Sequence, residues 1–158
     1  MTKVLVVLRH AQSAGKQSGR RDYDRTLTVQ GQAAAKVLGQ KLKQQNYNFQ
    51  LILSSSSTRT RQTVALINEI LQLPTEKILF KPELYEALMV HWLDHIYELP
   101  DGINQVLLVG HNPWLSMLAS RFKGSIHELS PCELISFEFQ SKKWREIGDQ
   151  GQEIMSIK

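Results

Sequence analysis

Hydrophobic residues along this chain gather in short continuous runs, and longer stretches with helical periodicity separate the runs. A short, continuous apolar run is typical of a strand that is buried on both faces of a parallel sheet. The runs that predict such strands cover residues 4–8, 51–53, 78–80 and 106–109.

The stretches between these runs predict helices. The first begins at Thr28, a good N-cap, and runs to about residue 45; its apolar face is formed by Ala34, Val37, Leu38 and Leu42. Further helices are expected from residue 58 to the Leu73–Pro74 stop and over 89–99. A fourth helix follows Asn112, with Asn112 as N-cap, Pro113 at the first helical position and Gly124 closing it.

The end of the chain predicts a last pair of strands, over 133–140 and 144–147. Alternating strands and helices imply an α/β fold, a three-layer sandwich with a mostly parallel central sheet and helices on both faces. A chain of 158 residues has the length of one domain, so we expect residues 1–158 to form a single domain. Ligands of such sheets bind beyond the carboxyl ends of the strands.

The composition and net charge limit the classes of partner that the protein is expected to bind. The net charge is +4, which favours anionic partners, and the sequence carries none of the usual nucleic-acid-binding motifs. The early apolar run at 4–8 is too short for a signal peptide or a membrane span, and Cys132 is the single cysteine. We therefore expect a cytoplasmic protein that binds neither nucleic acid nor membranes.

Three of the predicted strands are followed by residues that suit phosphate. Arg9 and His10 follow the first strand, Arg59 opens the helix after the second, and His111 follows the fourth. Because parallel strands end at one edge of a sheet, these four side chains are expected to converge.

Arginine binds phosphate through two parallel hydrogen bonds, and a neutral histidine can attack phosphorus. The sequence places no cluster of carboxylates beside these residues, so we expect no metal ion and no cofactor. His91 and His95 have metal-ligand spacing, but Trp92 stands where a zinc protease carries glutamate.

These segments together resemble the histidine phosphatase superfamily. The residues that carry the resemblance are Leu8-Arg9-His10-Ala11-x-Ser13, Asp24-Arg25-Thr26-Leu27-Thr28-x-x-Gly31, Ser54 to Thr63 with Arg59 in the family's Arg-x-x-Gln-Thr segment, and Val109-Gly110-His111-Asn112-Pro113. The compact chain is most similar to the SixA-type phosphohistidine phosphatases, which have the phosphoglycerate mutase-like fold.

The resemblance implies roles for individual residues. His10 corresponds to the phosphorylated nucleophile, Arg9 and Arg59 to the residues that hold the phosphoryl oxygens, and His111 to the second histidine of the pocket. Glu86, in Leu84-Tyr85-Glu86, corresponds to the family's proton donor. Arg61 lies two residues beyond Arg59 and is expected on another face of the helix, as a surface charge.

The sequence therefore predicts a metal-independent phosphatase that works through phospho-His10. The substrate implied by the resemblance is phosphohistidine in a protein, such as a histidine-phosphotransfer domain. Small phosphate monoesters, such as sugar or nucleotide phosphates, are the alternative substrate. A third reading is a binding module that captures phosphoproteins without turnover.

Overall fold

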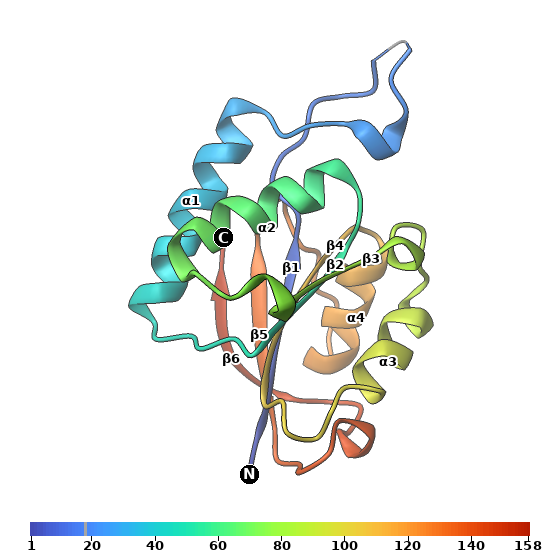
Figure 1. The fold of residues 1–158 in the computed structure, drawn as a ribbon. Coiled ribbons are helices and arrows are strands. Elements are labelled where there is room, and N and C mark those ends of the chain that lie inside the picture. The colour runs from blue at the N-terminus through green and yellow to red at the C-terminus, as the bar shows by residue number, and fades with distance from the viewer. Residues whose placement is uncertain (18) are drawn as a thin grey trace.

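The computed structural model describes residues 1–17 and 19–158. A six-stranded sheet, with the strand order β3-β2-β4-β1-β5-β6, forms the centre of the molecule (Figure 1). The strands are β1 (Lys3–Arg9), β2 (Leu51–Ser55), β3 (Ile78–Lys81), β4 (Gln105–Gly110), β5 (Leu134–Phe139) and β6 (Gln152–Ile157). The helices are α1 (Val29–Gln44), α2 (Thr58–Leu71), α3 (Met89–Tyr97) and α4 (Trp114–Lys123).

The sheet is mixed, with a parallel part that holds four strands. β3 pairs with β2, β2 with β4 and β4 with β1 in parallel, whereas β5 pairs antiparallel with β1 and with β6. This topology confirms the α/β fold expected from the sequence, with its mostly parallel sheet. The register sets Arg9 opposite Gly110, so β1 and β4 end at the same level.

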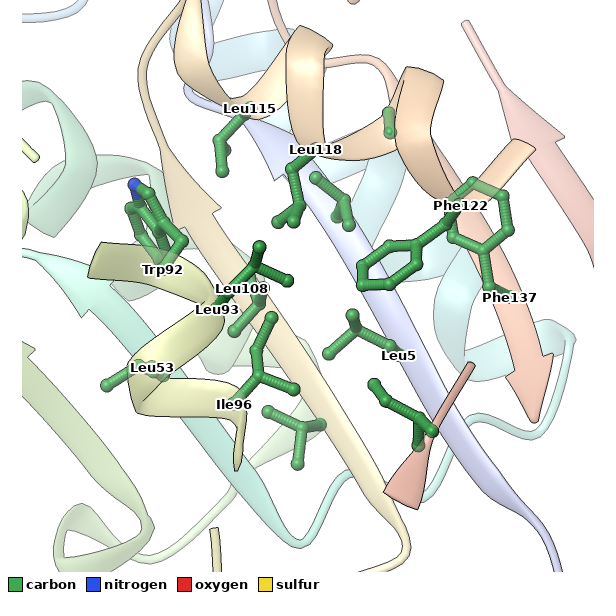
Figure 2. Close-up of a cluster of buried hydrophobic side chains, with 14 of the residues drawn as sticks. Leu5, Leu53, Trp92, Leu93, Ile96, Leu108, Leu115, Leu118, Phe122 and Phe137 are labelled. Carbon is green, nitrogen blue, oxygen red and sulfur yellow. The ribbon is translucent and has the colours of Figure 1, made fainter. Parts of the chain in front are cut away.

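Helices cover both faces of the sheet, and alternate residues of the strands face them. Leu5 and Val7 of β1 pack into a cluster with α3 and α4, whereas Val6 and Leu8 pack into a second cluster with α1 and α2. Figure 2 shows Leu5 and Leu108 of the sheet among side chains of α3 and α4. Burial on both faces explains why β1, β2 and β4 are continuous apolar runs rather than alternating ones.

The prediction of a strand over 144–147 is wrong. Residues Trp144–Glu146 form a 3₁₀ turn, which buries Trp144 and lets its indole N–H donate to the carbonyl of Ile103 at 2.7 Å. The partner of β5 is β6, near the C-terminus of the chain. β6 is mostly exposed and lies at the edge of the sheet, so it lacks the apolar pattern by which the sequence reveals a buried strand.

Two helix details also differ from the prediction. In α1 the expected apolar residues Ala34 and Val37 are exposed, and Gly31, Ala35 and Gly39 are buried instead. Small residues are buried there because α1 packs closely against α2: a methyl group on Gly39 would lie 3.0 Å from the Cδ1 atom of Ile70.

α4 begins at Trp114, one residue later than predicted, so Pro113 precedes the helix instead of opening it. Asn112 still bonds to this end of the helix, because its Oδ1 accepts from the backbone N–H of Ser116 at 3.3 Å and from the Ser116 hydroxyl at 2.6 Å. Gly124 closes α4 in the left-handed conformation, as predicted. Within residues 1–17 and 19–158, none of the helices has the length and hydrophobicity needed to cross a bilayer.

Gly31 lets the loop after β1 approach the start of α1. A Cβ atom at this position would lie 2.1 Å from the backbone oxygen of Gln12. The same oxygen accepts a hydrogen bond from the backbone N–H of Thr28 at 3.0 Å, and the Thr28 hydroxyl caps α1 by accepting from the N–H of Gly31 at 2.9 Å. The close contact therefore fixes the loop that follows His10.

We predict that Gly31→Ala lowers the free energy of unfolding by about 1–3 kcal/mol, the usual cost of overpacking, because backbone must move to admit the methyl group. Urea unfolding followed by circular dichroism measures this change. Gly102→Ala is the matched control, since nothing lies within 4 Å of a Cβ built on Gly102. Equal stability of the Gly31→Ala variant and the wild type would contradict the close approach.

Candidate active site

The carboxyl ends of β1, β2 and β4 meet at one edge of the sheet and form a cleft of about 290 Å³. The backbone N–H of His10 donates to the carbonyl of Gly110 at 3.1 Å, which ties the end of β1 to the end of β4. The cleft is lined by basic and uncharged side chains: Arg9, His10, Gln12, Ser13, Arg25, Arg59, His111, Asn112 and Pro131. The structure thus brings together the four side chains that the strand ends were predicted to gather.

Gly110 allows this edge to form. A Cβ atom on Gly110 would lie 2.5 Å from the ring of Trp92, which is fully buried beneath the end of β4. The close packing of α3 on this point of the sheet leaves room for hydrogen only. His111 can then follow β4 directly into the cleft.

Hydrogen bonds fix the proton on the ring of His10. Its Nδ1 lies 2.7 Å from the carbonyl oxygen of Ala11, which can only accept, so Nδ1 carries the proton. Its Nε2 accepts a hydrogen bond from Nε of Arg59 at 3.3 Å. The lone pair of Nε2 is therefore free of a proton and lies beside an arginine of the cleft.

The surroundings of His10 also keep the ring neutral. Only 7% of its surface is exposed. Burial and, to a smaller extent, the positive charges of Arg59, Arg9 and Arg25 lower the pKa of His10 to about 4, against the opposing effect of the Ala11 hydrogen bond. At neutral pH the imidazole is thus a base with an available lone pair.

His111 lies on the other side of the cleft. Its ring centroid is 5.2 Å from that of His10, and its Nε2 lies 2.7 Å from the hydroxyl of Ser55 at the end of β2. Burial, followed by the nearby His10 and Arg59, lowers the pKa of His111 to about 3. Its buried Nδ1 has no hydrogen-bond partner within the described residues and can bond to a ligand.

Arg9 is anchored at one end of its guanidinium. Nη1 donates to the carbonyl of Leu129 at 3.0 Å, and the buried Nε has no partner among residues 1–17 and 19–158. Burial lowers the pKa of Arg9, although a guanidinium stays charged at physiological pH. Arg9 also lines the cleft, so it can present its positive charge to an anion there.

Arg59 is held by Asp22, a residue that the sequence did not point to. Nη1 of Arg59 donates to the backbone oxygen of Asp22 at 2.8 Å, and Nη2 donates to its carboxylate at 3.2 Å. The same carboxylate accepts from the hydroxyl of Tyr85 at 2.5 Å and from Nε of Arg25 at 2.9 Å. Asp22 thus joins two arginines of the cleft to Tyr85.

The ring of Tyr85 also reaches the site. It packs edge-on against His111, with 5.7 Å between the ring centroids. The Tyr85 hydrogen bond, followed by the charges of Arg59 and Arg25, lowers the pKa of Asp22 to about 2. Burial and Asp22 raise the pKa of Tyr85 to about 12, so the carboxylate stays ionised and the phenol stays protonated at neutral pH.

Glu86, the predicted proton donor, is exposed and is not among the residues that line the cleft. It is Tyr85, its neighbour in the chain, that contacts His111 and Asp22.

Arg61 also lies away from the cleft: its Nε donates to the carbonyl of Ser56 and its guanidinium stacks over Phe80. No group of three or more metal-ligating side chains occurs within the described residues.

Comparison with known proteins shows the family. Residues 5–93 match the model of the histidine phosphatase superfamily (branch 1). This segment covers more than half of the chain and contains Arg9, His10 and Arg59. The chain belongs to the histidine phosphatase superfamily.

Individual relatives agree with this assignment. An uncharacterized chloroplastic protein of Arabidopsis thaliana is 30% identical over 155 residues, which cover 92% of this chain and 71% of that protein. A proposed SixA phosphohistidine phosphatase of Agrobacterium tumefaciens superposes with a TM-score of 0.87 at 25% identity, over 99% of this chain and 97% of the other. A protein histidine phosphatase SixA, solved with tungstate, shares the fold with a TM-score of 0.83 at 20% identity, over 98% of this chain and 96% of the other.

This histidine phosphatase is therefore an enzyme with its family's α/β fold.

The contact between Asp22 and Arg59 can be tested by substitution. We predict that Asp22→Asn tightens inhibition by vanadate, a phosphate analogue, by about 3- to 10-fold, because the cleft loses a partly screened negative charge. Arg59 keeps its hydrogen bond to the backbone oxygen of Asp22 and so keeps its place.

Inhibition constants for vanadate measure this effect. Asp24→Asn is the matched control, because Asp24 lies in the same 3₁₀ turn but pairs with the exposed Arg21. Weaker vanadate binding by Asp22→Asn would show instead that the carboxylate is needed to orient Arg59.

Proposed function

We propose that this phosphatase removes phosphoryl groups from phosphohistidine in proteins. The phosphoryl group is transferred first to His10 and then to water. Nε2 of His10 attacks phosphorus, a new P–N bond forms at His10, and the P–N bond of the substrate breaks. The ring of the substrate phosphohistidine already carries a proton on its other nitrogen, so the substrate histidine leaves as a neutral imidazole. Water then attacks phospho-His10, which releases inorganic phosphate and restores the neutral imidazole.

Four residues of the cleft have a part in these two steps. Arg9 and Arg59 bind the oxygens of the transferring group, where their charges balance the phosphate without a metal ion. His111 bonds another oxygen, because its Nδ1 is buried beside the cleft and has hydrogen-bonding capacity left. The hydrogen bond that Nδ1 of His10 donates to the carbonyl of Ala11 keeps the Nε2 lone pair of His10 available for the attack.

The lining of the cleft is the observation that carries the choice of substrate. Its side chains are basic or uncharged, and Asp22, which holds Arg59 and Arg25, has a pKa of about 2 and stays ionised. An alkoxide leaving group needs a proton donor, whereas a phosphorylated imidazole leaves readily when its ring is protonated. Phosphohistidine therefore suits this lining better than an alkyl phosphate. The likeness to SixA structures supports the same choice.

The expected role of Glu86 differs between phosphohistidine and alkyl phosphates. We propose that this exposed carboxyl serves as the donor for alkyl phosphates and has little part in the cleavage of phosphohistidine. General acid catalysis is worth roughly 10²–10⁴-fold. The contribution is large for a poor leaving group and small for an imidazole.

We predict that Glu86→Gln lowers kcat/KM for glycerol phosphate by roughly 100-fold or more and changes kcat/KM for a phosphorylated histidine-phosphotransfer domain less than about twofold. The wild type should prefer the phosphoprotein, with or without EDTA. Glu83→Gln is the matched control, because Glu83 is an exposed carboxylate nearby that bonds to His95 at 3.3 Å.

Two results would change the proposal. Efficient hydrolysis of sugar phosphates by a wild type that ignores phosphohistidine proteins would make small monoesters the substrate. Phosphoprotein binding without turnover of any of these compounds would favour a binding module. If Glu86→Gln affected neither substrate, Glu86 would have no part in the chemistry.

A further inference from the structure

A second and larger hollow lies beside the active site. We call it the α4 groove; it has a volume of about 570 Å³ and lies between α4, Met89 and the segment 124–128. Met117 of α4 is 45% exposed here, and Ile126 is 92% exposed. Exposed apolar side chains gathered around a groove mark a surface that binds another molecule.

The α4 groove is continuous with the active-site cleft. A hollow of about 270 Å³ joins the two: it shares Arg9, Asn112 and Pro131 with the cleft, and it shares Pro113, Ser116 and Glu128 with the α4 groove. A phosphoryl group needs the cleft alone. A protein that presents phosphohistidine to His10, in contrast, extends beyond the cleft, and this groove is a surface next to it.

We propose that the α4 groove binds an amphipathic helix of the phosphorylated protein substrate; the inference rests on the function proposed above. The apolar residues of the α4 groove, Met89, Met117 and Ile126, would contact the apolar face of the substrate's helix while the phosphohistidine enters the cleft. Methionine side chains adapt to a partner's surface because they are unbranched and flexible.

The walls of the groove favour a helix over an extended peptide. One wall is α4, whose backbone groups are bonded within the helix, and the edges of the sheet at β3 and β6 are separate from the lining of the groove. An extended peptide gains affinity by adding a strand to such an edge, and the groove does not offer one. A helix satisfies its own backbone and needs only side-chain contacts.

The test compares two substrates that share the same scissile P–N bond. These are a histidine-phosphotransfer domain, phosphorylated with phosphoramidate, and free phosphohistidine. Ile126→Asp and the double variant with Met117→Asp should lower kcat/KM for the phosphoprotein by about tenfold or more, because they place charge in the apolar contact. Turnover of free phosphohistidine and inhibition by vanadate should not change.

Val37→Asp is the matched control. Val37 is 47% exposed, close to the value for Met117, and lies on α1 at the opposite face of the sheet. Ile126 is almost fully exposed, so Ile126→Asp tests the groove without disturbing the core.

Each other outcome overturns the docking site in a recognisable way. If the Ile126→Asp and double variants turned over the phosphoprotein as fast as the wild type, the groove would have no part in substrate binding, and the proposed function would still hold. Equal losses on both substrates would show that the groove acts on the chemistry and does not select the partner. A wild-type dimer that the double variant converts to monomer would make a second copy of the chain the occupant. Failure of the wild type to act on the phosphoprotein at all would refute the proposed function itself.

Discussion

The hydrogen bond between Nδ1 of His10 and the carbonyl oxygen of Ala11 is the interaction on which the chemistry of this site depends. A carbonyl oxygen cannot donate, so it fixes the proton on Nδ1 and leaves the lone pair on Nε2. A neighbouring backbone carbonyl provides this control without any acidic residue. The opposite tautomer would direct a proton toward the phosphoryl group and prevent attack.

The rest of the molecule holds that ring in place and keeps it neutral. Parallel pairing of β1 with β4 and of β4 with β2 brings His10, His111 and Ser55 together, and the helices on both faces bury the strands that lead to them. Burial near three arginines lowers the pKa of His10, and Asp22 holds two of these arginines. The anionic substrate is attracted by the same charges that keep the imidazole unprotonated.

The sequence predicted the part of the site that follows from regular structure. Arg9, His10, Arg59 and His111 stand next to apolar runs, and parallel strands must end at one edge, so their convergence could be inferred from the order of elements. Asp22 and Tyr85 lie in or beside 3₁₀ turns, which carry no periodic signal. Their positions depend on tertiary contacts, such as the hydroxyl of Tyr23 donating to the carbonyl of Ser56 at 2.7 Å.

The same distinction explains where the structure adds to the sequence or departs from it. Glu86 and Tyr85 are adjacent, and only the turn in the structure decides that Tyr85 contacts His111, whereas the role of Glu86 stays a prediction. The sequence does not predict β6, because an exposed edge strand lacks an apolar run. It predicts a strand at Trp144, because a buried aromatic residue in a 3₁₀ turn gives the same local pattern as one in a strand. Local patterns determine which segments are buried, whereas the contacts between segments determine which side chain of a turn faces the site.

The central claim is that Nε2 of His10 takes the phosphoryl group. The most direct measurement is to quench the enzyme with alkali during turnover of a phosphorylated histidine-phosphotransfer domain, digest it, and identify the phosphorylated atom by mass spectrometry and NMR. The account predicts phosphate on Nε2 of His10 and none on the His10→Asn variant. Phosphate on Nδ1, on another residue, or on the His10→Asn protein would contradict it.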